Sequence, residues 1–240
     1  AQTDCLSLSM TQASRALCGN PSEVLLNALL AGLLAESRVP AGSILDAGAN
    51  DGEESCRFSL AARGRTVHAI DPLQQNVDAM RTRFASLPNL QPMLGGLGNR
   101  ARTLHAPVKS TKASVGSQLF NLQSMRDSGE AELGQPFQVH RVDELFGSRW
   151  PTERLALAHI DVEGAELDVL HGANATIAAS RPVLSLEVYP QTKESAARPL
   201  LHALSELGHD AHEHVRVAQL QARRAARLRK HVHVHRDVPV

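Results

Sequence analysis

Four carboxylates, Asp46, Asp51, Glu53 and Glu54, crowd into the short stretch ILDAGANDGEES (44–55), which also carries two glycines. A glycine loop that follows a strand often binds phosphate through its backbone N–H groups. Carboxylates packed this closely would instead repel a phosphate and attract a cation. The stretch therefore predicts a binding loop for a ligand that is cationic or neutral.

The loop also lacks both of the common glycine patterns that bind phosphate. The dinucleotide fingerprint G-x-G-x-x-G, begun at Gly48, requires glycines where the chain has Asn50 and Glu53. The P-loop pattern requires a lysine before Ser or Thr, and none follows here. The pattern that remains is D-x-G-x-N-x-G, in which Gly48 and Gly52 allow close approach of the backbone. Because both phosphate-binding patterns are missing, a nucleotide-dependent oxidoreductase is a weak alternative.

A second acid, Asp71, ends the stretch TVHAIDP (66–72) and comes about 20 residues after Gly48. In nucleotide-binding sheets, an acid at this distance hydrogen-bonds the ribose hydroxyls. A ribose-bearing ligand that has positive charge and no phosphate fits S-adenosylmethionine, which we infer as the cofactor. An ordinary helix-capping acid and a turn glycine would use the same residue types, but the agreement of both positions favours a site.

A third cluster, His159, Asp161 and Glu163, lies in the stretch HIDVEGAELDVLHGA (159–173). Side chains of these types can act as a general base that removes a proton from a reacting group, and all three are candidates for that role. His159 and Asp161 are two residues apart, so on a strand they share a face. A buried core position for His159 is an equally good interpretation, because periodicity does not tell which face is buried.

Alternating strand and helix patterns place these residues in a common framework. Such alternation predicts an α/β fold with a mostly parallel sheet, in which ligands bind at the carboxyl ends of the strands. Asp46, Asp71, Asp161 and Glu187 each fall at such an end. The predicted strands are residues 43–48, 66–72, 90–94, 154–162 and 181–188, and the predicted helices are 53–64, 74–87, 165–180 and 194–208. Between residues 95 and 145 the pattern weakens, which predicts lid or substrate loops apart from one strand that starts at Phe137.

The amino-acid composition excludes some classes of function for this chain. Lys plus Arg and Asp plus Glu each total 25 of the 240 residues, and aromatics are 3%, so we expect no nucleic-acid partner. No apolar run approaches the length of a membrane span. We expect a helical extension over residues 1–40 and one catalytic domain over residues 41–240. Cys5 and Cys18 could form a disulfide, which would indicate an oxidising compartment; a cytoplasmic location is otherwise preferred over a mature secretory-pathway protein.

The stretches LDAGANDG, AIDP, VDEL, HIDVEGAELDVLHGA and RPVLSLEV, in this order, resemble the FkbM family of S-adenosylmethionine-dependent methyltransferases. The resemblance runs from Ile44 to Pro190, and DVEGAELDVLHGA is its specific part. It implies a Rossmann-like class I methyltransferase fold, with a mostly parallel seven-stranded sheet and helices on both faces. It also implies O-methylation of sugar or natural-product hydroxyls.

The resemblance further assigns roles to individual positions. It places the methionine end of the cofactor at the glycine loop, the ribose at Asp71 and the adenine near the turn after the third strand. It places Asp161 and Glu163 beside the transferring methyl. The expected cofactor-binding residues are Asp46, Gly48, Ala49, Asn50, Asp51, Asp71, Pro72, Gly95, Gly96 and Asp161. The expected catalytic residues are Asp161, Glu163 and His159. The chain departs from the family at His159, where Lys is common, and at Asp71, where Glu is common.

Some alternatives stay open at this stage. Asp161 and Glu187 carry oxygens that would suit Mg²⁺, but hydrogen bonds to neighbouring loops explain them as well, so we assign no metal ligand. The alternating HVHVH (231–235) reads as a half-buried strand rather than a metal patch. The expected function is methyl transfer to a small-molecule or glycan hydroxyl, and the alternative is a cofactor-binding protein of the same fold without transfer activity. The sequence does not predict an oligomeric state.

Overall fold

The structure is a computed structural model that describes residues 29–30, 32–107, 133–162, 164–188, 193–208, 211–213 and 230–234. The predictions that concern Cys5, Cys18, Glu163 and the stretch before residue 29 fall outside these residues. The boundary proposed at residue 40 stays a prediction, although Leu34 and Val39 pack into the core of the following domain.

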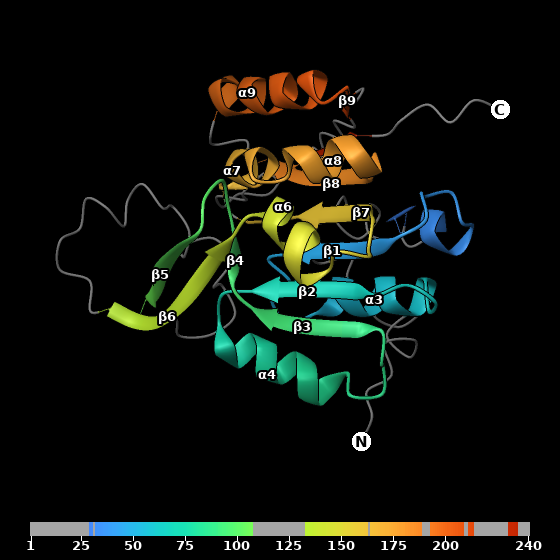
Figure 1. The fold of residues 1–240 in the computed structure, drawn as a ribbon, viewed down its shortest axis with the longest axis vertical. Helices are drawn as coiled ribbons and strands as arrows, with labels where there is room; N and C mark the ends of the chain where they lie inside the picture. Colours follow the sequence, from blue (N-terminus) through green and yellow to red (C-terminus); the bar gives the residue numbers. More distant parts are fainter. Residues whose placement is uncertain are drawn as a thin grey trace, which may run out of the picture.

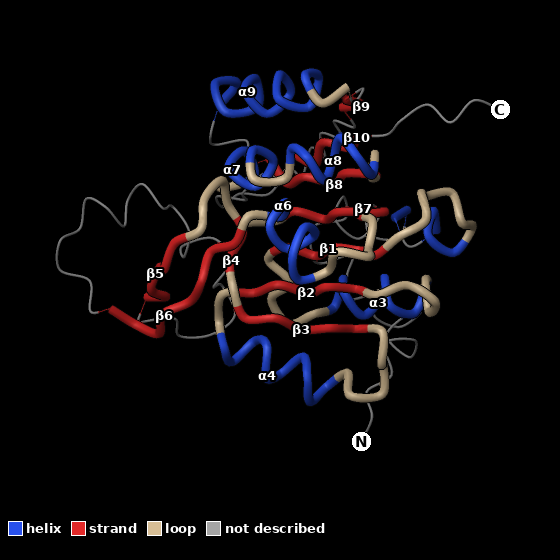
Figure 2. The backbone as a smooth tube through the Cα atoms, viewed as in Figure 1, coloured by secondary structure: helices blue, strands red, loops and turns tan. Residues whose placement is uncertain are grey.

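A seven-stranded sheet forms the centre of the molecule (Figures 1 and 2), in the order β3-β2-β1-β7-β8-β10-β9. The five strands from β3 to β8 are parallel to one another, whereas β10 is antiparallel to both β8 and β9. The predicted, mostly parallel seven-stranded sheet is therefore confirmed. The strands are β1 (Ser43–Ala47), β2 (Val67–Asp71), β3 (Leu90–Leu94), β7 (Leu155–Ile160), β8 (Val183–Val188), β9 (Ala211–Glu213) and β10 (Lys230–Val234).

The edge position of β3 follows from Pro92, which has no N–H to donate to a ladder and is confined to edge strands. By contrast, β1, β2 and β7 are buried over their whole length. Strands that are covered on both faces must be apolar on both faces, which explains their continuous hydrophobic sequences. The polar exceptions in these strands, such as Asp46 and His159, therefore require a specific partner.

Helices cover both faces of the sheet, as predicted (Figure 1). One face carries α3 (Glu53–Ala61), α4 (Gln74–Arg83) and the helical residues 29–30 and 32–35. The other face carries α6 (Val142–Glu144), the π-helical turn Leu145–Arg149, α7 (Glu166–His171), α8 (Asn174–Ser180) and α9 (Lys193–Glu206). The predicted apolar face is confirmed, because Val77 and Met80 of α4 and Phe84 directly after the helix are all buried.

A second, three-stranded sheet occupies part of the region between residues 95 and 145 where loops were expected, and residues 108–132 of that region fall outside the described residues. Its order is β4-β6-β5, and it projects from the carboxyl edge of the main sheet in Figure 1. Phe137 and Val139 attach it to the domain through a small core that includes Leu73. The strand predicted from Phe137 is confirmed as the end of β6, whereas the prediction of loops was wrong for β4, β5 and the start of β6, because these strands gain their apolar contacts from residues distant in sequence. The strands are β4 (Gly96–Leu97), β5 (Arg102–Pro107) and β6 (Leu133–His140).

Three helix predictions also need correction. The helix expected over residues 74–87 ends at Arg83. The helix expected to close at Gly64 ends earlier, at Ala61. The single helix expected over residues 165–180 is broken into α7 and α8 between His171 and Asn174. A β-carbon on Gly172 would lie 2.0 Å from the carbonyl oxygen of Gly98, so the break lies where another segment contacts the chain closely.

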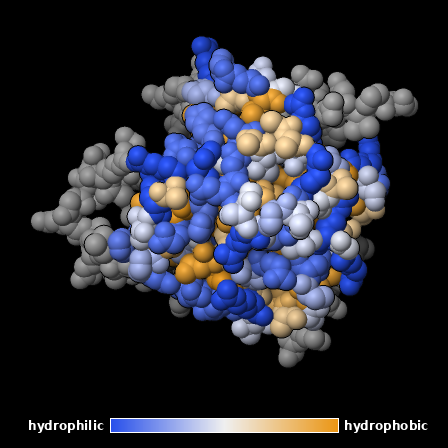
Figure 3. Space-filling model, viewed as in Figure 1, coloured by the Kyte–Doolittle hydropathy of each residue, from blue (hydrophilic) through white to orange (hydrophobic). Residues whose placement is uncertain are grey.

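The surface seen in Figure 3 is mainly hydrophilic, with small and separate apolar areas. Within the described part of the chain, no helix has the length and apolar character needed to cross a membrane. Cys56 in α3 is fully buried and is disulfide-bonded.

Candidate functional site

The glycine loop between β1 and α3 is built from unusual backbone conformations. Gly48, Asn50 and Gly52 all have positive φ, at 82°, 50° and 78°. A β-carbon on Gly48 would lie 1.9 Å from the carbonyl oxygen of Asp161, and one on Gly52 would lie 2.6 Å from the Met80 side chain. Glycine is needed at both positions for conformation and for space. The loop is thus pressed against the segment that carries Asp161.

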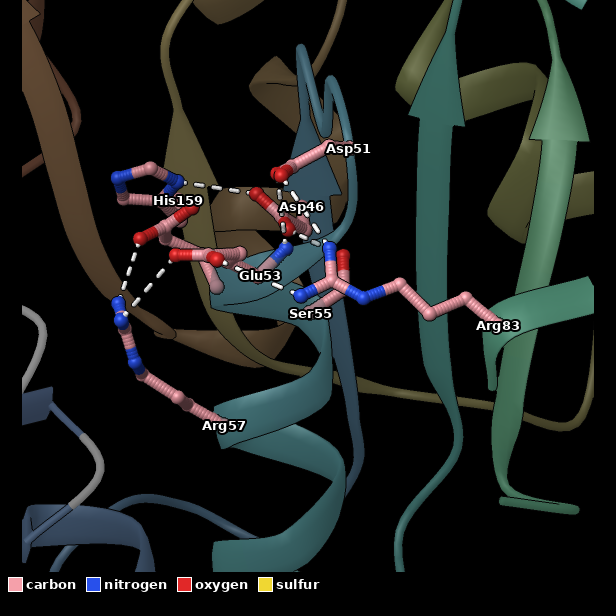
Figure 4. A network of polar contacts seen from close by, with 8 residues as sticks. Asp46, Asp51, Glu53, Ser55, Arg57, Arg83 and His159 are labelled. Carbon is pink, nitrogen blue, oxygen red and sulfur yellow. Dashed lines mark hydrogen bonds and ion pairs between the residues drawn. The ribbon is translucent and has the colours of Figure 1, made fainter. Parts of the chain in front are cut away.

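Asp46 lies under this loop, at the centre of a buried polar network (Figure 4). Its carboxylate is 1% exposed. One oxygen accepts a hydrogen bond from the hydroxyl of Ser55, in the first turn of α3, and the other lies 3.0 Å from Nδ1 of His159. The sequence-based prediction singled out Asp46 and His159 but not Ser55, because a serine in a helix carries no signal of its own.

His159 is held as a cation by this network. Burial by itself lowers the pKa of His159, but the hydrogen bond and the charge of Asp46, together with the charges of Asp161 and Glu54, outweigh burial and raise the pKa to about 9. The imidazole is therefore protonated at neutral pH. A protonated imidazole donates hydrogen bonds and cannot accept a proton, which counts against the predicted role of His159 as a general base.

The remaining acids of the loop lie on the outside of the network. Glu53 and Glu54 begin α3, as predicted, where the helix dipole favours negative charge. Arg57 pairs with Glu54 at 2.8 Å, and Arg83 reaches from α4 to Asp51 at 3.3 Å. The Asp51 side chain is 55% exposed. These acids thus belong to a surface ion-pair network that joins α3 to α4.

Asp71 is buried at the end of β2, and its two carboxylate oxygens organise the loops around it. Oδ2 accepts a hydrogen bond from the N–H of Asn50 at 2.9 Å, and Oδ1 accepts from the N–H of Leu73 at 2.9 Å and from the amide of Asn76 at 3.0 Å. Burial raises the pKa of Asp71, and although these hydrogen bonds oppose the change, the pKa stands at about 6. Asn76 is a contact that the sequence did not predict.

The turn expected near the adenine is adjacent to Asp71. The N–H of Gly95 donates to the carbonyl oxygen of Asp71 at 3.0 Å. A β-carbon on Gly95 would lie 3.2 Å from the ring of His140, at the end of β6. Gly96 belongs to β4, where it pairs with Val139. The second sheet therefore forms one wall beside this turn, and Pro72 lies between Asp71 and the start of α4.

Asp161 follows β7, and its N–H donates to the carbonyl oxygen of Ala47 at 3.0 Å. The loop after it is organised by Glu166, whose Oε1 accepts from the N–H groups of Val162 at 3.2 Å and Gly164 at 3.1 Å. Burial raises the pKa of Glu166 to about 7, with a further contribution from the charge of Asp161. Glu166 was not predicted as a site residue, because its position in the first turn of a helix is ordinary for an acid.

Most of the predicted residues thus meet at the carboxyl edge of β1, β2 and β7. Gly48 contacts Asp161, Asn50 contacts Asp71, and Asp71 contacts Gly95. Ala49 is buried in the same loop. Among the described residues of this set, the Asp51 side chain lies at the surface and the Asp46 carboxylate points into the protein. Among the described residues, no group of three or more His, Cys, Asp or Glu side chains is placed to hold a metal ion.

Comparisons with solved structures find proteins of similar fold. A methyltransferase FkbM from Methylobacillus flagellatus KT has a similar fold, with a TM-score of 0.54 and 15% identity, over 81% of this chain and 44% of that one. This chain therefore spans less than half the length of that protein. Fibrillarin from Aeropyrum pernix, solved with natively bound S-adenosyl-L-methionine, gives a TM-score of 0.52 and 14% identity, over 88% of this chain and 74% of that one. Among curated proteins, no sequence matches the chain.

The likeness to these structures confirms the Rossmann-like class I methyltransferase fold. The family itself is shown by sequence, because the family model for the methyltransferase FkbM domain matches residues 46–225 of the 240. This chain therefore belongs to the FkbM methyltransferase family.

Proposed function

We propose that the protein is an S-adenosylmethionine-dependent methyltransferase that acts on a hydroxyl of a sugar, glycan or natural product. The observation that carries the proposal is the contact between Asp71 and both the glycine loop, through Asn50, and the Gly95 turn. One buried carboxylate thereby joins the segments expected to hold the methionine, ribose and adenine parts of the cofactor.

The donor and acceptor groups of the site fit this cofactor. An ionised carboxylate has about four acceptor positions, and the chain itself uses three on Asp71, from Asn50, Leu73 and Asn76. A ribose hydroxyl could use the remaining position, and donation from it would favour the ionised form of Asp71. Bound there, the cofactor would supply an activated methyl group for transfer.

The chain must also remove the proton of the acceptor hydroxyl. His159 is protonated below a pH of about 9, so the proposed base is the carboxylate of Asp161 or of Glu163, the latter outside the described residues. A base placed within hydrogen-bond reach of the hydroxyl contributes roughly 10²–10⁴-fold to the rate. The backbone contact between Gly48 and Asp161 supports Asp161, because it fixes this residue beside the cofactor loop.

Replacement of Asp71 by Ala tests the proposal. We expect wild-type protein to bind S-adenosylhomocysteine but not NAD, and Asp71→Ala to lose binding by about 100-fold or more, as expected for the loss of charge-assisted hydrogen bonds in a buried site. Isothermal titration calorimetry measures both. Asp78→Ala is the matched control, because Asp78 lies on the exposed surface of α4, where its side chain pairs with Arg81.

An affinity for S-adenosylhomocysteine that Asp71→Ala leaves unchanged would refute the ribose assignment. Transfer itself is tested with a radiolabelled methyl donor and a panel of sugars, glycans and extracts. Cofactor binding without transfer to any acceptor would instead support the alternative, a binding protein of the same fold.

A further inference from the structure

We infer that His159 is a positioning residue: as a buried cation, it holds the Asp46 carboxylate under the glycine loop and so fixes the loop against β7. The inference rests on the proposed function, because it concerns how the chain shapes its cofactor site. The observation behind it is a continuous row of contacts from Ser55 in α3, through Asp46 in β1, to His159 in β7 (Figure 4).

The contacts of Asp46 direct its carboxylate into the protein and not toward a ligand. Each of its oxygens already accepts a hydrogen bond, one from Ser55 and one from His159. Asp46 and His159 are opposite each other in the pairing of β1 with β7, so their side chains share one face of the sheet. Phe58 packs edge-on against the imidazole, with 6.0 Å between the ring centroids. Asp46 therefore acts on the site through the backbone to which it belongs.

That backbone reaches the site within two residues on both strands. Beyond Asp46, β1 leads to Gly48, and beyond His159, β7 leads to Asp161. The N–H of Asp161 donates to the carbonyl oxygen of Ala47 at 3.0 Å, and Gly48 lies directly against the carbonyl of Asp161. A buried ion pair directly below these contacts sets the position of the loop relative to Asp161.

The surroundings of His159 require a positive charge there. The charged groups of the described residues that act on it are acidic: Asp46 from β1, Asp161 from the end of β7 and Glu54 from α3. On the side of β8, its neighbour in register is Ser185, which is neutral and fully buried. Removal of one partner from a buried ion pair leaves an uncompensated charge, which costs far more than an exposed pair contributes. Without the cation, the buried Asp46 carboxylate would lose its oppositely charged partner.

Two substitutions separate the charge of His159 from its hydrogen bond. His159→Asn keeps a donor near the Nδ1 position but removes the charge, whereas His159→Lys keeps the charge. At pH 7.5 we expect His159→Asn to weaken the binding of S-adenosylhomocysteine about tenfold or more, as for a broken buried ion pair, and His159→Lys to stay within about threefold of wild type. His202→Asn is the matched control, because the His202 side chain is 74% exposed.

The dependence on pH distinguishes a charge from mere packing. We expect the ratio of the Kd of His159→Asn to that of wild type to fall toward one as the pH rises through about 9, where wild type loses the same charge. The ratio cancels the titration of the ligand's own amino group. A packing defect would leave the ratio constant with pH.

The nitrogen signals of the His159 ring provide a readout that needs no ligand. NMR titration should give a midpoint near pH 9 in wild type, and Asp46→Asn should lower it by at least about two units. A wild-type midpoint at or below about 6.5, the ordinary value for histidine, would overturn the inference, as would equal affinities of His159→Asn and wild type at pH 7.5. If wild type bound no S-adenosylhomocysteine, the proposed function would fail, and the ring titrations would still decide whether Asp46 holds His159 as a cation.

Discussion

Glu166 illustrates how one buried carboxylate can order a loop of the candidate site through hydrogen bonds to its backbone. Its Oε1 accepts two backbone N–H groups from the loop that follows Asp161, and the side chain is buried. Burial raises its pKa from 4.5 to about 7. Because the folded-state pKa is raised, the stability that Glu166 contributes is fully present below pH 4.5 and is lost as the pH rises through about 7.

Glu166→Gln should remove this dependence, since a glutamine oxygen can accept the same hydrogen bonds without a charge. We expect the Tm of the variant, relative to wild type, to increase by roughly 2–8 °C between pH 5 and pH 8. Thermal unfolding followed by circular dichroism measures it, with the exposed Glu144→Gln as the control. A difference between variant and wild type that stays constant over this range would contradict the account of Glu166.

Residues of the candidate site could be predicted from the sequence where their spacing along the chain is characteristic of a binding site. Gly48 and Asp71 stood out because a glycine turn and a distant acid at a strand end form a known combination. Ser55, Asn76 and Glu166 were missed, because their roles depend on hydrogen bonds that close only when loops meet. The sequence also could not predict which way the Asp46 side chain points, because alternation along a strand does not tell which face a ligand occupies.

At the scale of elements, the break between α7 and α8 shows why periodicity alone overextended a helix. The apolar pattern continues through the break, and Gly172 has helical dihedral angles, φ −79° and ψ −5°. Gly172 is nevertheless pressed against the carbonyl of Gly98, and its own carbonyl accepts from the N–H of Asp143. Contacts with the segment before β5 and with α6 thus end the helix, and neither contact is visible in the local sequence.

Gly172→Ala tests this close approach. The backbone of Gly172 suits alanine, so any loss must come from the added methyl, which would lie 2.0 Å from the Gly98 oxygen. We expect the variant to lose about 1–3 kcal/mol in the free energy of unfolding, as overpacked sites do. Urea denaturation measures this loss. Gly64→Ala is the control, because a β-carbon there meets no atom within 4 Å. Equal stabilities of the two variants would show that the contact does not constrain the chain.

The elements themselves were predicted well where each is long or has a clear boundary. The five parallel strands and α4 were expected from their apolar patterns and are confirmed. The second sheet was predicted only in part: the end of β6 was expected from Phe137 onward, whereas β4, which has two residues, and β5 were not expected. Short strands of this kind carry too few residues for a pattern of period two to stand out.

At the scale of the whole molecule, the site lies where several parts of the fold must stay together. The glycine loop contacts β7 through Gly48, Asp71 joins that loop to the turn at Gly95, and the second sheet forms a wall beside the turn through His140. A ligand that bridges these segments should therefore stabilise the folded chain as a unit. Any ligand that binds only the folded state stabilises that state by mass action.

S-adenosylhomocysteine at 100 times its Kd should add about 2.7 kcal/mol to the free energy of unfolding, which corresponds to a rise in Tm of roughly 5–11 °C for a domain of this size.

This stabilisation by the ligand should depend on pH through Asp71, whose pKa is about 6 in the free protein. In the proposed complex, a ribose hydroxyl would donate to the ionised carboxylate of Asp71, so binding below pH 6 would first have to displace a proton. At a fixed ligand concentration, we expect the rise in Tm to shrink between pH 7 and pH 5 in wild type. Asp71→Asn should show a smaller rise that does not change with pH over this range, and differential scanning fluorimetry measures both. A pH dependence that Asp71→Asn retains would assign the titration to another group.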